Sequence, residues 1–339
     1  MSNRQAHLVG SLPGPDARTA MTTALDIVGP YLRSLPDGET GPRNNWVGSA
    51  IDGLRGHPDL EVRGHGSGGD GAGQLRVRRG HRLFGASMDF GHVAATRDSH
   101  PVFEQLTADR DDVAFQQGFP GDFDMAALTL GPLAALRDRR AFTEATLAEI
   151  RGVRQIAGPS ALFQIEVPLE LVVMARTPAP GRPLLARLLT RNVTRLAAAA
   201  PAGTRFAVHL CVGDQEHRAL VRPTDVMPLV VLANEIAAHW PSSNPLVLVH
   251  APFAAADHPA NTDPAFLAPL RHLRLPAGVA FAAGFAHESQ SLRDQVRIRD
   301  HAEALLGREV VVAAACGLGR RSPADGIAVL ERMARLCTA

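Results

Sequence analysis

The sequence contains no lysine, and its 35 basic residues other than histidine are all arginine. Schiff-base chemistry on a lysine amine and the phosphate-binding lysine of a P-loop are therefore excluded. The formal net charge is only +1. A nucleic-acid-binding protein usually has a strongly basic surface, so we expect no nucleic-acid partner.

Long apolar runs are also missing. No stretch of 18 apolar residues predicts a membrane span, and Met1–His7 lacks the apolar core of a signal peptide. We therefore expect a cytoplasmic protein with no membrane partner.

Cysteine is scarce as well. The three cysteines, Cys211, Cys316 and Cys337, are odd in number and widely spaced. This pattern argues against a disulfide scaffold and favours a reduced protein whose few thiols serve another purpose.

The second half of the sequence alternates between short apolar runs and segments of helical periodicity, such as 227–239 and 291–306. Nearly continuous apolar runs are typical of parallel strands that are covered on both faces. The runs are 162–166, 206–210, 246–250, 279–283 and 310–314.

Two earlier runs, 7–10 and 31–35, fit the same pattern, and one more strand is expected between 84 and 130. About eight strands alternating with helices predict an α/β fold, a (β/α)8 TIM barrel, in a single domain over 1–339. An open doubly wound sheet is less favoured because its glycine fingerprint is absent.

A glycine-rich stretch, 64–73, interrupts the first half of the chain. We interpret it as part of a loop insertion over about 56–82, because patterned sequence continues on both sides. Phosphate binding is the less favoured alternative, since no strand–loop–helix frame surrounds the glycines.

Functional side chains of a barrel gather at the carboxyl ends of its strands. Polar or metal-binding residues recur at these positions in the predicted strands, namely Ser11, Asp37, Glu39, Glu166, His209, Cys211, His250, His287 and Cys316.

His209 and Cys211 are the most specific pair among these residues. Alternate residues of a strand point to the same face, so the imidazole and the thiol lie together. Both are zinc ligands, and Cys316 could supply a third from across the barrel mouth. The alternative is a buried thiol beside a hydrogen-bonded histidine. Cys337, near the end of a predicted last helix, is expected to be a bystander.

Four segments resemble the catalytic half of cobalamin-independent methionine synthase, in the superfamily that also contains uroporphyrinogen decarboxylase. His209-Leu210-Cys211 and Ala315-Cys316-Gly317-Leu318-Gly319-Arg320 resemble the zinc site of that enzyme. His7-Leu8-Val9-Gly10-Ser11-Leu12-Pro13 resembles its thiol-contacting segment, and Gln164-Ile165-Glu166-Val167-Pro168 resembles a segment in its substrate or folate region. The likeness spans nearly the whole chain, although the synthase has two barrels and this chain has one.

The resemblance also marks two departures. The zinc glutamate of the family ends the strand that follows the His-x-Cys strand, whereas here that strand ends in His250. The fourth ligand is therefore expected to be His250, a substrate atom or water, with Glu235 a less favoured choice. The segment from Asp37 to Arg43, followed by Trp46, has no counterpart that we can assign in the synthase.

These observations together predict a zinc-dependent methyl or alkyl transferase that activates a thiol as a zinc-bound thiolate. The metal ligands would be His209, Cys211, Cys316 and His250. Catalytic roles are expected for Glu166, Asp37 and His287, and substrate binding for Ser11, Glu39, Arg43, Trp46 and Arg320.

The expected partners are a small thiol acceptor and a donor, which could be methyl-folate, a methylcorrinoid or another alkyl donor; a homodimer is also possible. Two alternatives stay open. One is a metal-independent decarboxylase or lyase of the uroporphyrinogen decarboxylase type, and the other is a non-catalytic barrel that binds a thiol or a corrinoid.

Overall fold

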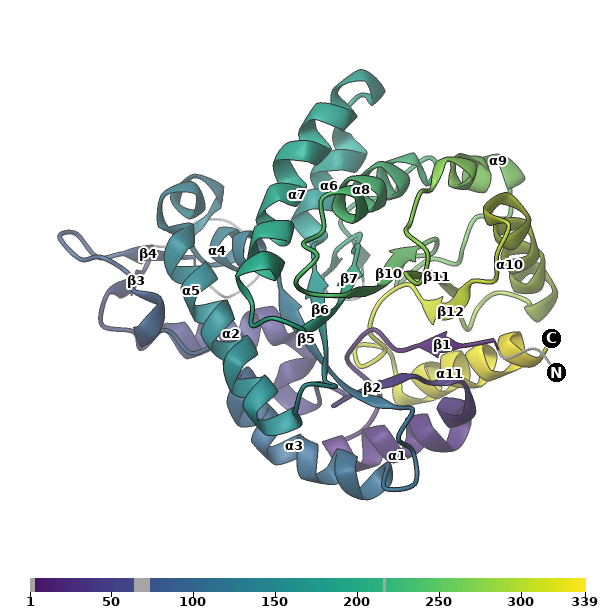
Figure 1. Cartoon of the computed structure of the whole chain (residues 1–339), viewed down its shortest axis with the longest axis horizontal. Helices are drawn as coiled ribbons and strands as arrows, with labels where there is room; N and C mark the ends of the chain where they lie inside the picture. The colour runs from purple at the N-terminus through teal and green to yellow at the C-terminus, as the bar shows by residue number, and fades with distance from the viewer. Residues whose placement is uncertain (1–3, 64–73, 216–217) are drawn as a thin grey trace.

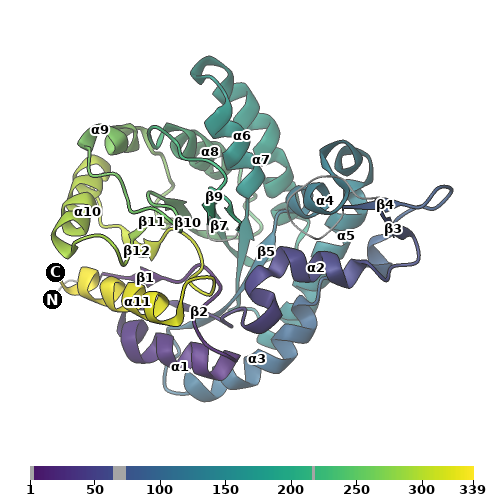
Figure 2. The same cartoon turned by 180° about the vertical axis from the view of Figure 1, so that it is seen from behind.

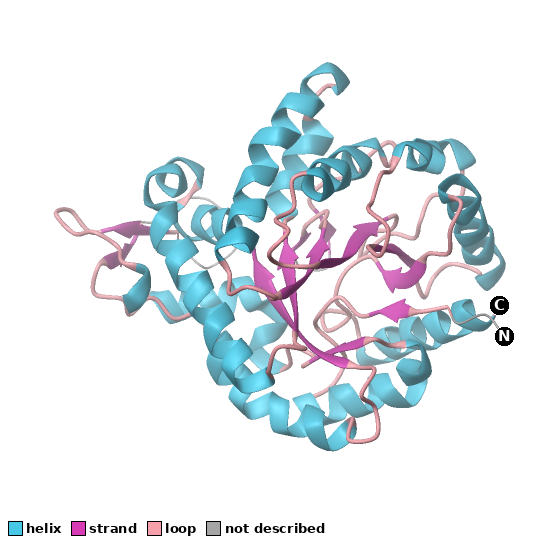
Figure 3. Ribbon diagram, viewed as in Figure 1, coloured by secondary structure: helices cyan, strands magenta, loops and turns pink. Residues whose placement is uncertain are grey.

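The computed structural model describes residues 4–63, 74–215 and 218–339. Eight parallel strands form one nearly closed sheet in the order β1-β12-β11-β10-β7-β6-β5-β2 (Figures 1 and 3). An isolated parallel bridge connects Ala6 of β1 to Leu32, two residues before β2. The chain is therefore a (β/α)8 TIM barrel. The barrel strands are β1 (Ala6–His7), β2 (Ser34–Pro36), β5 (Ala114–Pro120), β6 (Leu162–Glu166), β7 (Arg205–His209), β10 (Leu246–Pro252), β11 (Ala280–Ala286) and β12 (Val311–Ala314).

Helices surround the barrel, and both views show α11 beside β1 and α1 (Figures 1 and 2). The helices are α1 (Ala17–Val28), α2 (Trp46–Leu54), α3 (His92–Leu106), α4 (Asp122–Leu130), α5 (Pro132–Ala157), α6 (Pro168–Arg176), α7 (Arg182–Ala199), α8 (Met227–Ala238), α9 (Pro264–Leu267), α10 (Leu292–Leu306) and α11 (Pro323–Thr338). Within the described ranges, none of them is both long and apolar enough to cross a bilayer.

Local sequence explains where several of these helices begin and end. The side chains of Asp16, Ser291 and Ser322 accept hydrogen bonds from backbone N–H groups in the first turns of α1, α10 and α11. Such caps satisfy donors that the helix itself leaves unpaired. Gly307 ends α10 in the left-handed conformation, which glycine adopts without steric cost.

The main core lies between the outer face of the sheet and the helices. Phe115, Phe163, Phe206 and Phe281 are all nearly inaccessible there. Each contributes on the order of 1.5–3 kcal/mol through burial of its apolar surface.

The inside of the barrel is layered. Small and aliphatic side chains fill its amino-terminal end, namely Ala114, Leu162, Ala207, Leu248, Ala282, Val311 and Ala313. One inward position further along the strands, the lining becomes polar, with Gln116, Gln164, His209 and His250 all fully buried. Because inward side chains recur every second residue, the next level brings Glu166 and Cys211 to the carboxyl end of the barrel.

A second apolar cluster lies outside the barrel and includes Leu60, Leu75, Met125 and Phe142. The antiparallel pair β3 (Leu60–Val62) and β4 (Leu75–Val77) packs there and projects from the body of the molecule (Figure 1). Both strands lie within the range 56–82, whose interpretation as an insertion stays a prediction. The glycine-rich stretch 64–73 falls outside the described residues.

The predicted strands of the second half are confirmed, and the strand expected between 84 and 130 is β5. The predicted strand 31–35 exists, but its predicted first residue is wrong. Gly29–Tyr31 forms a short 3-10 turn that contains Pro30, and the strand begins only at Ser34. Proline has no N–H to donate to a sheet, so the turn delays the strand.

The remaining short elements connect the barrel units. They are the pair β8 (Asp214–Gln215) and β9 (Arg218–Ala219) and the 3-10 turns η1 (Gly29–Tyr31), η2 (Gly41–Asn45), η3 (Gly85–Ser87), η4 (Ala179–Gly181) and η5 (Ala268–His272).

Candidate metal centre and carboxyl pair

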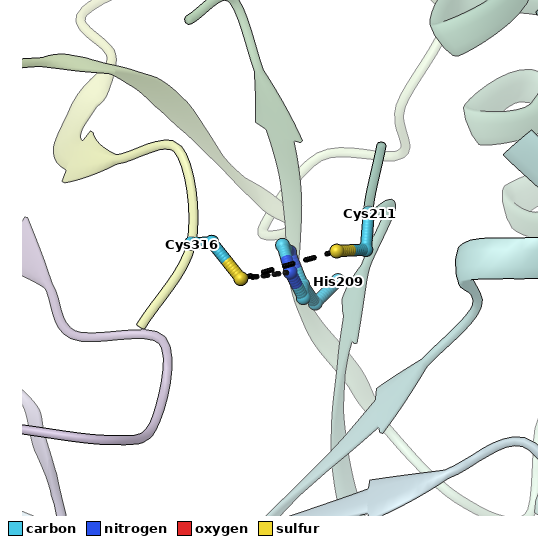
Figure 4. Close-up of side chains that lie close together, drawn as sticks. All are labelled: His209, Cys211 and Cys316. Carbon is cyan, nitrogen blue, oxygen red and sulfur yellow. Dashed lines mark hydrogen bonds between the residues drawn. The ribbon is translucent and has the colours of Figure 1, made fainter. Parts of the chain in front are cut away.

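One imidazole and two thiols converge at the carboxyl end of the barrel (Figure 4). The ligand atoms of His209, Cys211 and Cys316 all lie within 4.8 Å of one another. The Sγ atoms of Cys211 and Cys316 are 3.9 Å apart, and Cys316 Sγ is 3.9 Å from His209 Nε2. A tetrahedral zinc ion with Zn–S bonds of about 2.3 Å places two sulfurs about 3.8 Å apart. The donor set and its spacing therefore fit zinc.

The loop that carries Cys316 is fixed against the segment that follows β1. The backbone oxygen of Ser11 accepts a hydrogen bond of 2.6 Å from Leu318 N, and Ser11 Oγ accepts one of 3.2 Å from Gly319 N. A Cβ atom on Gly317 would lie 2.3 Å from Ser11 Oγ, so only glycine permits this approach. The hydroxyl of Ser11, expected to bind substrate, thus positions the cysteine loop.

The two thiols differ in acidity. The pKa of Cys316 is lowered well below its ordinary value, first because the thiol of Cys211 can donate to its sulfur, and also because His209 and Arg320 stabilise the thiolate. Arg320 Nη2 lies 3.8 Å from that sulfur. The same contact and burial raise the pKa of Cys211. The pair thus favours one thiolate at Cys316, and a bound cation would favour the second.

His250 does not belong to the group of atoms that could share an ion. Its Nδ1 lies 2.6 Å from His209 Nδ1, and its Nε2 lies 3.0 Å from the backbone oxygen of Ala314. The prediction of His250 as a direct ligand therefore disagrees with the geometry. In the β7–β10 register His250 pairs with His209, one inward level below Cys211. The next inward residue of β10 is Pro252, whose side chain has no ligand atom.

Two buried carboxyl groups lie beside the thiols. Glu39 and Glu166 are 6% and 8% exposed, and a Cβ atom on Gly118 would be 3.1 Å from Glu39 Oε1 and 3.3 Å from Glu166 Oε1. Burial and the charge of Glu166 raise the pKa of Glu39 well above its ordinary value. Burial also raises the pKa of Glu166 to about 7. The pair can therefore hold a proton near neutral pH.

The backbone at Glu39 is strained. Its φ of 43° is the one positive value at a non-glycine residue in the described ranges. Asp37 supports this turn, because its Oδ1 accepts a hydrogen bond from Glu39 N and its Oδ2 pairs with Arg43 at 2.6 Å. Strain of this kind persists where the surroundings enforce it, and it gathers at functional sites.

A small cavity of ≈ 70 Å³ lies beside Glu39, and Glu39, Arg43, Trp46 and Gly118 are among the residues that line it. The three predicted substrate-binding residues of this segment thus meet at one place. Asp37, predicted to be catalytic, is 2% exposed and ion-paired.

The other two predicted residues are placed differently. Arg320 contacts the sulfur of Cys316 and also donates a hydrogen bond to the backbone oxygen of Asn44. His287 follows β11, and its Nδ1 lies 3.0 Å from Ser289 Oγ and 3.2 Å from Glu288 Oε2. Its catalytic role stays a prediction.

A larger cavity of ≈ 510 Å³ lies between the loops that follow β7 and β10, and none of the three candidate ligands lines it. Val212, the neighbour of Cys211, lines it together with Pro252, Phe253 and Phe266. Sequence reasoning missed this cavity because its lining is mostly apolar and lies in loops without a motif.

Comparison with known proteins adds a likeness in fold. No family model matches the chain, and no curated protein matches it either. A candidate vitamin-B12 independent methionine synthase from Listeria monocytogenes superposes with a TM-score of 0.59 over 95% of this chain and 85% of that one, at 10% identity. A candidate lyase/mutase from Burkholderia cenocepacia J2315 superposes with a TM-score of 0.40 over 92% and 77%, at 14% identity. At 10% identity, the first likeness shows a shared fold.

Proposed function

We propose that this protein is a zinc-dependent transferase that moves a methyl or other alkyl group to the sulfur of a small thiol. The observation that carries the proposal is the mutual spacing of His209, Cys211 and Cys316, with two 3.9 Å separations that suit tetrahedral zinc. The fold shared with a candidate methionine synthase supports it.

Three protein ligands characterise catalytic rather than structural zinc sites, because a fourth position stays open for substrate. Bound zinc would supply Lewis acidity that lowers the pKa of a substrate thiol. His209, Cys211 and Cys316 would hold it.

The carboxyl pair suits the proton transfer of this reaction. The substrate thiol must lose its proton before its sulfur attacks, and Glu166, with a pKa of about 7, can accept that proton at neutral pH. The new S–C bond then forms as the bond between the alkyl carbon and the donor breaks, and the electron pair of the broken bond stays with the donor.

The two cavities offer places for the two substrates. The ≈ 70 Å³ cavity at Glu39, Arg43 and Trp46 suits the polar end of the thiol acceptor. The ≈ 510 Å³ cavity, which is lined by Val212, falls within the usual range of about 300–1,000 Å³ for ligand sites and suits the donor. Methyl-folate, a methylcorrinoid and other alkyl donors remain the candidate donor classes.

One observation favours a second candidate function. The proton-sharing carboxyls Glu39 and Glu166 would also serve a metal-independent lyase or decarboxylase, in which one carboxyl group is the acid. Such an enzyme would have no need of the two thiols.

A metal assay decides between the two functions. The protein purified from zinc-supplemented cells should hold one equivalent of zinc. Cys211→Ser and Cys316→Ser should lose it, while Cys337→Ser, a buried thiol far along α11, is the matched control and should keep it. After cobalt replaces zinc, added small thiols should change the visible spectrum, because a sulfur joins the metal. Absence of stoichiometric metal, together with an unaffected Cys211→Ser variant, would overturn the transferase proposal in favour of the lyase.

A further inference from the structure

The rings of His209 and His250 belong to a buried series of hydrogen bonds that leads to the candidate ligands His209, Cys211 and Cys316. Both residues are 0% exposed, and their ring centroids are 4.7 Å apart. The series runs from the backbone oxygen of Ala314 to His250 Nε2 at 3.0 Å, and then from His250 Nδ1 to His209 Nδ1 at 2.6 Å. It ends at His209 Nε2, the atom that faces Cys316 Sγ.

Hydrogen-bond chemistry fixes the protons along this series. A carbonyl oxygen only accepts, so His250 Nε2 must carry a hydrogen. A neutral imidazole carries one hydrogen, which leaves a lone pair on His250 Nδ1. The 2.6 Å contact between the two Nδ1 atoms then requires a hydrogen on His209 Nδ1. When the His209 ring is neutral, its lone pair therefore lies on Nε2, where a metal ligand needs it.

The surroundings of His250 are shaped for this arrangement. A Cβ atom on Gly284 would lie 2.7 Å from His250 Nε2 and 2.9 Å from the oxygen of Ala314, so glycine leaves the room for this contact. The register between β11 and β12 also shifts between Gly284 and Ala286, next to Ala314. An irregularity of this kind interrupts the regular ladder and can re-aim a backbone group.

We propose that His250 is a positioning residue that holds His209 in the Nδ1–H tautomer, through an acceptor contact at His250 Nδ1, and so aims the Nε2 lone pair of His209 at the metal site. The consequence for zinc rests on the proposed function, whereas the tautomer itself is a property of the metal-free protein. A ligating histidine generally donates its other ring N–H to such an outer partner, and loss of the partner typically lowers metal affinity about 10–100-fold.

The first test needs neither metal nor substitution. Two-bond couplings between ring nitrogens and ring protons, measured by NMR on metal-free protein with 15N-labelled histidine, show which nitrogen carries the hydrogen. His209→Gln and His250→Gln variants assign the signals. We expect Nδ1–H at His209 and Nε2–H at His250. A His209 ring that carries no hydrogen on Nδ1 would overturn the proposal.

The second test uses two variants of nearly equal shape. Asn at position 250 can place an amide oxygen near the position of the lost Nδ1 acceptor, whereas Leu fills a similar volume without an acceptor. Zinc affinity is measured by competition with a coloured chelator, and thermal unfolding of the metal-free variants controls for folding. We expect His250→Leu to lower zinc affinity about 10–100-fold and His250→Asn to stay within about threefold of wild type.

The outcomes separate this proposal from the proposed function. Wild-type zinc affinity in a folded His250→Leu variant would overturn the positioning role, as would equal losses in the two folded variants. If the wild-type protein binds no zinc, the transferase proposal fails, while the NMR result still decides the tautomer. Should His250→Leu not fold, the NMR experiment decides alone.

Discussion

A buried carboxyl pair between α4 and α6 should make the stability of this barrel fall as pH rises. Asp124 is 0% exposed and Glu170 is 2% exposed. Burial, followed by the charge of Glu170, raises the pKa of Asp124 well above its ordinary value, and burial raises the pKa of Glu170 to about 7. Asp124 Oδ1 accepts a hydrogen bond from Leu169 N, which ties the pair to the first turn of α6.

The sign and size follow from linkage between proton binding and folding. Glu170 has a folded-state pKa of about 7 against an ordinary value of 4.5, so the folded protein binds its proton more tightly than the unfolded chain. Its stabilising contribution is complete below about pH 4.5, falls by about 1.4 kcal/mol per pH unit above that, and levels off above about pH 7. Between pH 5 and pH 8 the loss should be on the order of 2–3 kcal/mol.

Glu170→Gln tests this, because glutamine keeps the shape of the protonated carboxyl group and cannot ionise. We measure the free energy of unfolding in urea by circular dichroism at pH 5 and pH 8. The fall between these pH values should be smaller in Glu170→Gln than in wild type, by about 2–3 kcal/mol. Glu331→Gln makes the same change on the exposed surface of α11 and should behave like wild type. An equal fall in wild type and Glu170→Gln would refute the reasoning.

Three further predictions concern the site and the core. Gly118→Ala should push apart Glu39 and Glu166, whose oxygens would lie 3.1 and 3.3 Å from the new Cβ, and should lower turnover at least tenfold in a thiol-alkylation assay, with zinc content unchanged. The rate in wild type should rise with pH through about 7 as Glu166 ionises, and Glu166→Gln should lose that dependence in a pH–rate profile. Phe163→Ala should lower the free energy of unfolding by about 3–5 kcal/mol in urea titrations, because it empties a fully buried position.

The strands of the second half could be predicted because each is buried on both faces, and such burial requires an apolar side chain at nearly every position. A strand such as 246–250 is covered on both faces and reads as a continuous apolar run. The strand beginning at Ser34 was harder, since it has three residues and follows a turn whose proline lies within an apolar run. Short strands carry too few side chains for a periodicity to appear.

The parts of the site that lie within one strand or one loop could be predicted from the sequence. His209 and Cys211 share a face because strand residues alternate, and this needs no tertiary information. The proximity of Glu39 to Glu166 depends instead on barrel closure and on the space left by Gly118. The place of His250 depends on the register between two strands, which the sequence of either strand does not specify.

That register has a consequence for the proposed chemistry. Because His250 pairs with His209 and the next inward residue of β10 is Pro252, β10 offers no ligand atom at the level of Cys211. Among the residues that the structure describes, the grouping of possible ligand atoms stops at the imidazole and the two thiols. A tetrahedral zinc ion held there would keep one position for a further donor. A substrate sulfur is the donor that the proposed thiol transfer requires at that position. The register that keeps His250 behind His209 would therefore also leave a bound zinc ion open to substrate.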